Sequence, residues 1–183
     1  MKISAIGASV AVVVASVASA DVTYTFTNKT WTAFTFTEAY AAGSLTGTLT
    51  GVSVNATLNA SVKFTYADDL CVYMDAAPLG TFGLLQVGGF FNLSALHRYS
   101  WPNGGSSTPG TTVSGTVNLT TAINMAATAN ATQSIWIGNG YGGSGNAGTW
   151  TGTITLIGVN VPAPGAVALL GLAGAIGGRR RRA

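Results

Sequence analysis

Apolar and polar residues alternate along most of the chain between residues 21 and 160. In the clearest example, from Val52 to Tyr66, every second residue is apolar and those between are polar. A period of two residues is typical of a strand with one buried and one solvated face. Fifteen residues would span about 50 Å as one strand, so we expect a bend or break near Asn59. Leu49 and its neighbours lie in the opposite phase, which predicts a turn or bulge near Gly51.

Shorter segments with the same alternation lie along the rest of this region. They are interrupted by two Gly-rich stretches, residues 102–110 and 138–148, which we interpret as loops. Phe90–Trp101 has no regular period, and no stretch shows a helical pattern. We therefore predict an all-β domain over residues 21–160, an antiparallel β-sandwich of eight to ten strands and of jelly-roll type. The alternating segments are Val22–Phe26, Phe34–Phe36, Leu70–Met74, Val113–Leu119 and Trp150–Leu156. Phe82–Val87 is a short apolar run, and Ser134–Ile137 is one further strand segment.

Residues 1–20 have the organisation of a secretory signal peptide. Lys2 supplies a positive charge, Ile3–Val17 is an apolar run, and Ala18 and Ala20 form an A-x-A cleavage site. We therefore expect export through the Sec translocon and cleavage by signal peptidase, which leaves Asp21 as the first residue.

Residues 161–183 form a second targeting segment, in which a Pro-containing motif, an apolar stretch and an arginine cluster follow one another. As a short hydrophobic helix the apolar stretch would be about 20 Å long, whereas the hydrocarbon of a bilayer is about 30 Å thick. Arginines favour the cytoplasmic side. These features predict a transient inner-membrane anchor. The motif is Pro162, Ala163 and Pro164 within residues 161–165, the apolar stretch is residues 166–178, and the cluster is Arg179, Arg180, Arg181 and Arg182.

This segment resembles the PEP-CTERM sorting signal of Gram-negative bacteria, in which a Pro-Glu-Pro motif, a short hydrophobic helix and an arginine cluster direct an exported protein to an exosortase. Ala163 replaces the Glu of that motif. The resemblance implies processing by an exosortase-like membrane protease or transpeptidase, and delivery to the cell surface or an exopolysaccharide-rich biofilm matrix. Pro162 and Pro164 keep the motif extended, which suits an active-site groove. A simple tail anchor is the alternative interpretation.

Part of the domain also resembles the galactose-binding-like jelly rolls of convertase P-domain type. The similarity involves residues 69–73, Gly80, residues 87–89, and residues 134–141 together with 148–150. It implies a β-sandwich and says little about activity.

Charge is scarce and is concentrated in the targeting segments. Charged residues make up 7% of the chain, against about 25% in ordinary soluble domains. Between the two targeting segments, Lys29, Lys63 and Arg98 stand against five acidic residues, so the domain has a net charge of −2. This excludes a basic surface, and we expect no nucleic-acid partner. Cys71 is the only cysteine, and we interpret it as a small buried apolar residue.

Candidate catalytic and metal-ligating residues are few. His97 is the only histidine and no nucleophile motif accompanies it, so we predict a protein that is not an enzyme; a secreted hydrolase using His97 and an Asp is the alternative. Asp68, Asp69 and Asp75 form the one carboxylate cluster and are the candidate ligands for Ca²⁺. Solvated charges at strand ends are the alternative for these residues, and no other cofactor is expected.

Aromatic residues beside the Gly-rich loops are the candidate ligand contacts. Exposed rings can stack on sugar faces, and Trp101 and Tyr141 are the candidates. Trp136 and Trp150 lie within strand patterns, and we interpret them as core residues. The predicted function is that of a non-enzymatic exported surface or extracellular-matrix protein associated with polysaccharide. A carbohydrate-binding module is a second hypothesis, and self-assembly through exposed strand edges is another.

Overall fold

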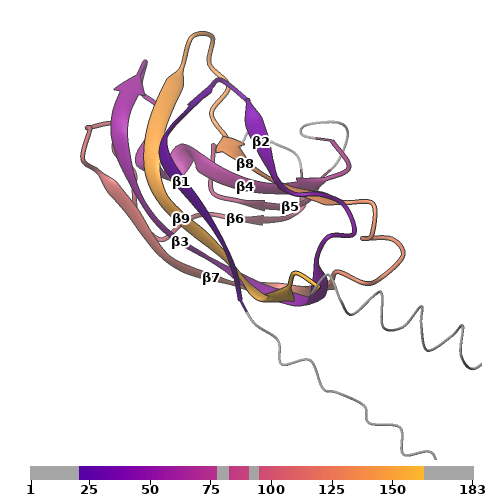
Figure 1. Cartoon of the computed structure of the whole chain (residues 1–183). Coiled ribbons are helices and arrows are strands. Elements are labelled where there is room, and N and C mark those ends of the chain that lie inside the picture. Colours follow the sequence, from indigo (N-terminus) through magenta and orange to yellow (C-terminus); the bar gives the residue numbers. More distant parts are fainter. Residues whose placement is uncertain (1–20, 78–82, 91–94, 163–183) are drawn as a thin grey trace, which may run out of the picture.

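The computed structural model describes residues 21–77, 83–90 and 95–162, which form two facing sheets (Figure 1). These residues contain nine strands and one short 3₁₀ helix, η1 (Ala67–Asp69). No helix in the described ranges has the length and apolar character needed to cross a membrane. The predicted signal peptide, with Ala18 and Ala20, lies outside the described residues. So does the sorting segment from Ala163 onward, with Pro164, the apolar helix and Arg179–Arg182.

Sheet A is entirely antiparallel and has the strand order β1, β9, β3, β7. Buried and solvated positions alternate along much of β3 and β9, the two central strands. This is the burial expected when one face packs on a core and the other meets water. The strands are β1 (Val22–Thr32), β3 (Thr46–Val62), β7 (Thr112–Asn124) and β9 (Ala147–Asn160).

Sheet B has the strand order β2, β8, β4, β5, β6. The predicted sandwich of eight to ten strands is confirmed, but the prediction that all strands are antiparallel is wrong, because β5 and β6 are parallel. The sixth strand lies in Phe90–Trp101, where no period was recognisable. The strands are β2 (Phe36–Tyr40), β4 (Leu70–Asp75), β5 (Gly83–Val87), β6 (Ala95–Tyr99) and β8 (Ser134–Asn139).

The long strand β3 has the two irregularities that its length and phase predict. Its register against β9 shifts between Leu58 and Ala60, at the expected bend, and its register against β7 shifts between Leu49 and Gly51, at the expected bulge. An extra residue on one strand bends it and increases its twist. β3 can therefore remain one strand of 17 residues and still curve around the core.

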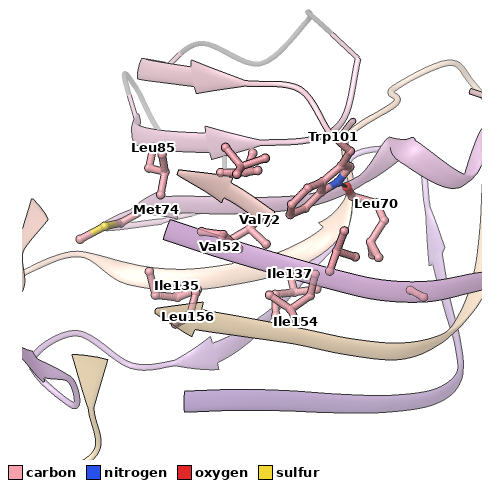
Figure 2. Packing of buried hydrophobic residues seen from close by; sticks show 14 of the residues in the cluster. Val52, Leu70, Val72, Met74, Leu85, Trp101, Ile135, Ile137, Ile154 and Leu156 are labelled. Carbon is pink, nitrogen blue, oxygen red and sulfur yellow. Dashed lines mark hydrogen bonds between the residues drawn. The ribbon is translucent and has the colours of Figure 1, made fainter. Parts of the chain in front are cut away.

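The core fills the space between the sheets with apolar side chains from both (Figure 2). In the figure, Val52, Ile154 and Leu156 of sheet A lie opposite Val72 and Ile137 of sheet B. Burying each such side chain contributes about 1.5 to 3 kcal/mol. The tryptophans add the largest volumes, and their N–H groups need partners.

Trp150 is fully buried in this core, as predicted. Its indole N–H donates to the carbonyl of Ala67 over 3.1 Å, which ties β9 to η1. Trp136 differs, because it is only half-buried and packs against a second cluster. The prediction of a core position is thus confirmed for Trp150 and only in part for Trp136.

Candidate functional site

The strand directions bring several loops together at one end of the sandwich. β4 begins at this end and β8 finishes there, because Leu70 pairs with Asn139. β5 and β6 are parallel and also finish there, where Val87 pairs with Tyr99. The segments that precede β4 and follow β5, β6 and β8 therefore meet, although they are far apart in sequence.

Backbone hydrogen bonds join these segments around η1. Gly89 N–H donates to the carbonyl of Asp68 over 2.8 Å, and Gly140 N–H donates to the carbonyl of Asp69 over 2.7 Å. Asp68 N–H donates to the carbonyl of Gly104 over 3.2 Å. Three loops are thus fixed to one helical turn by main-chain contacts, which do not depend on flexible side chains.

Two adjoining pockets at this end form what we call the aromatic cleft. One pocket has a volume of about 260 Å³ and the other about 200 Å³, and they share Tyr66, Asp69 and Phe90. Concave sites with convergent aromatic and polar side chains are where ligands usually bind. The aromatic residues of the cleft are Phe64, Tyr66, Phe90, Trp101 and Tyr141, and its carboxylates are Asp68 and Asp69.

Three rings of the cleft are unusually exposed for this molecule. Phe64 is 76% exposed, Phe90 49% and Tyr66 42%, and these are three of the six large apolar side chains that are exposed in the described ranges. Phe90 and Tyr141 meet edge to face, with ring centroids 5.6 Å apart. Exposed apolar surface gathered at one hollow marks an interaction site.

The end of β3 explains why two of these rings face solvent. Lys63 and Phe64 have φ angles of 51° and 64°, in the left-handed region that residues other than Gly rarely adopt. Thr65 Oγ1 stabilises the turn by donating to the carbonyl of Val62 over 3.1 Å. The alternating pattern predicted Phe64 and Tyr66 on the buried face of β3. That prediction is wrong, because β3 ends at Val62 and the chain turns outward.

Phe90 is positioned by the turn between β5 and β6. The Gln86 side-chain amide donates to the carbonyls of Gly88 and Phe90, over 3.0 and 3.3 Å, and Phe90 N–H donates to the carbonyl of Gly140. Gly88 has a φ angle of 74°, and a Cβ atom there would overlap the Trp101 indole nitrogen. Only glycine permits this close packing of the turn.

The two carboxylates of the cleft are held in a poorly hydrated position. Burial raises the pKa of Asp69 to about 6; the Tyr66 N–H, which donates to Asp69 Oδ2 over 2.7 Å, opposes this shift, and the charge of Asp68 adds to it. Burial also raises the pKa of Asp68. Among the described residues, the charged side chain that shifts the pKa of Asp69 is that of Asp68, which raises it.

The predicted cluster of Asp68, Asp69 and Asp75 is wrong. Asp75 lies at the other end of β4, about 17 Å away along the strand, and its Oδ1 accepts the N–H of Ala76. Within the described ranges, no three His, Cys, Asp or Glu side chains are placed to hold a metal ion. These three residues therefore do not form one Ca²⁺ site.

The two predicted sugar contacts lie at the cleft but differ in exposure. Trp101 is only 5% exposed, and its indole N–H donates to the carbonyl of Leu70 over 2.6 Å (Figure 2). It forms a wall of the cleft, and the prediction that its ring is a stacking surface is wrong. Tyr141 is half-buried beside Phe90, and its role as a sugar contact stays a prediction.

Cys71 and His97 take no part in the cleft. Cys71 is fully buried, as predicted. Burial raises the pKa of its thiol strongly and the Asp69 carboxylate raises it further, whereas Arg98 opposes the shift; such a thiol is unreactive. His97 lies in the middle of β6 and lines neither pocket of the cleft, so the structure does not place it beside Asp68 or Asp69.

A comparison with protein-family models, curated proteins and solved structures found no match to this chain. The functional argument therefore rests on the residues of the cleft.

Proposed function

We propose that the protein is a non-enzymatic, exported surface or matrix protein whose β-sandwich binds polysaccharide in the aromatic cleft. The observation that carries the proposal is the concentration of exposed rings at one hollow: Phe64, Tyr66 and Phe90 lie beside two carboxylates. Aromatic faces cover the apolar C–H faces of sugars, while carboxylate oxygens accept hydrogen bonds from hydroxyl groups. The proposal combines the surface-protein and carbohydrate-binding hypotheses.

We further infer that the sandwich is of jelly-roll type. If β6 is set aside, the antiparallel pairs β1 with β9, β2 with β8, β3 with β7 and β4 with β5 are nested along the chain. A long antiparallel ribbon has this nesting, and rolling it up adds the pairs β3 with β9 and β4 with β8. Two Greek keys in two sheets describe the same order. In this arrangement connections on both arms of the ribbon, between β3 and β4 on one and after β5, β6 and β8 on the other, contribute residues to the cleft.

The export part of the proposal rests on the targeting segments. Residues 1–20 supply a signal peptide, and Pro162 to Arg182 supply a sorting signal cut by an exosortase-like enzyme. The mass of the exported protein tests both steps at once. The expected mature chain begins at Asp21 and ends within residues 161–165; a secreted form with both ends intact would contradict this part.

Retention on immobilised polysaccharides tests the binding part. We expect Phe90→Ala to weaken binding about tenfold, because a lost stacking ring costs about 0.5 to 1.5 kcal/mol beyond the area it buried, and Phe64→Ala to have a similar effect. Leu96→Ala is the matched control, since Leu96 is 62% exposed on β6 and lines neither pocket. Equal retention of all three variants on every polysaccharide would rule out the cleft as the binding site.

A further inference from the structure

We propose that the aromatic cleft selects sugars that carry a protonated amine, as in a deacetylated amino-sugar polymer. This inference rests on the proposed function, because it names the ligand class of the same site. It follows from the sign of the charges around the rings, which binding to a neutral polysaccharide does not require.

The charged side chains of the cleft are all carboxylates. Asp68 and Asp69 are the only charged residues among those that line the two pockets in the described ranges. Lys63 is next to Phe64 in sequence, but its Nζ donates to the carbonyl of Ser144 over 3.1 Å. Arg98 lines a small cavity of about 40 Å³ that adjoins the cleft at Gly89 and Ser100, but it is not among the residues that line the cleft itself. The cleft therefore attracts a positive group and repels an acidic sugar.

The rings favour the same sign of charge. An ammonium group within about 6 Å of an aromatic face is attracted by the ring quadrupole, and cages of several rings recognise such cations. Phe64, Tyr66, Phe90 and Tyr141 line one pocket together with Asp69. A neutral sugar can use the carboxylate only as a hydrogen-bond acceptor for its hydroxyl groups, whereas an amino sugar also gains the attraction between opposite charges.

The carboxylates are maintained in an unfavourable environment. Burial disfavours the charged form of Asp69, as its raised pKa shows, and a group that destabilises the empty protein in this way is characteristic of a functional site. A ligand ammonium would place an opposite charge beside this carboxylate, which is only 7% exposed. We therefore expect the ligand to lower the pKa of Asp69, as any adjacent cation does.

The test compares a glucosamine oligomer with the N-acetylglucosamine oligomer of the same length. Titration calorimetry at about pH 6.5 is suitable, because Asp69, with a pKa of about 6, is then mostly ionised. We expect the amine form to bind at least about tenfold more tightly, and its affinity to fall with added salt. Asp69→Asn and Asp68→Asn should each bring the two affinities to within about threefold.

Two controls separate charge from folding. Asp21→Asn removes one charge from the exposed first residue of the domain, before β1, outside the residues that line the cleft, and should leave the preference unchanged. The side-chain amide oxygen introduced by Asp69→Asn can still accept the hydrogen bond from the Tyr66 N–H. Because the folded-state pKa of Asp69 is raised, its carboxyl group favours folding most below about pH 4, and this contribution is lost as pH rises through about 6. At neutral pH the melting temperature of Asp69→Asn should therefore be a few degrees higher than that of the wild type. Such an increase shows that a loss of binding in this variant does not come from misfolding.

The possible outcomes separate the two proposals. Equal binding of both oligomers overturns the amine selectivity, and a preference that survives in both Asp variants overturns its assignment to Asp68 and Asp69. Either result leaves the carbohydrate-binding proposal in place. If neither oligomer binds, the amine selectivity is overturned; if no other polysaccharide is retained either, the proposed function fails as well.

Discussion

The outer faces of the two sheets differ in what covers them. In sheet A, the central strand β3 presents polar side chains such as Ser53, Asn55 and Thr57 on its outer face, and these are half-buried or exposed. In sheet B, the central strand β4 is buried along its whole length. Tyr73 on its outer face is as inaccessible as Val72 on its inner face. Only one of the two sheets has the solvated face that a two-layer sandwich suggests.

A second apolar cluster covers sheet B. Cys71, Tyr73 and Ala95 are buried there, and Phe34, Phe36 and Trp136 pack against them. The Tyr73 and Phe36 rings lie 6.1 Å apart, and Tyr73 also accepts the N–H of Gly83 over 3.1 Å. Tolerance to substitution should therefore depend on the sheet as well as on the face of the strand. Three predictions test this dependence.

The largest effect is expected for Tyr73→Ala. Removing a buried ring leaves a cavity and typically costs about 3 to 5 kcal/mol of unfolding free energy. Urea denaturation followed by circular dichroism measures it. A loss below about 1 kcal/mol would mean that the outer face of sheet B is as permissive as that of sheet A.

An intermediate effect is expected for Tyr73→Phe. The ring remains, but the buried Gly83 N–H loses its acceptor, which costs about 1 to 2 kcal/mol. Tyr99→Phe is the matched control, because the Tyr99 hydroxyl accepts the N–H of Thr120 at an exposed site, where water replaces the lost partner. Similar losses in the two variants, again measured by urea denaturation, would contradict the claim that sheet B is covered.

The smallest effect is expected for Asn55→Ala. Asn55 occupies the exposed face of the central strand of sheet A, and exposed substitutions of this kind usually change stability by less than about 0.5 kcal/mol. The same denaturation experiment applies. A loss above about 1.5 kcal/mol would indicate that something covers this face too.

The contrast between the sheets also explains which parts of the fold were predictable. The alternation along Val52–Val62 predicts the buried face of β3, and its length and phase predict the irregularities near Gly51 and Asn59. For β4, the side chains on both faces of the strand are apolar enough to be buried. Burial of the outer face depends on Phe34, Phe36 and Trp136 from other segments, and no local pattern indicates that these residues cover it.

The cleft was predictable only in its neighbourhood. The positions of Trp101 and Tyr141 beside Gly-rich loops indicate the end of the molecule that carries the cleft. Trp101 itself, however, is buried by its packing against Gly88. For Phe64 and Tyr66 the alternation predicts core positions, because both residues continue it. The length of the run gives no signal against this assignment, because β3 itself has 17 residues, more than the 15 from Val52 to Tyr66.

The sequence by itself determined the all-β character, most of the strand segments but not β6, and the buried face of sheet A, because a period of two residues is a local property of the chain. Tertiary structure alone decided the parallel pairing of β5 with β6, the covering of sheet B and the meeting of the aromatic rings with Asp68 and Asp69. These features arise from contacts between segments far apart in sequence. Their energies depend on which surfaces meet, and that information does not lie within any one segment.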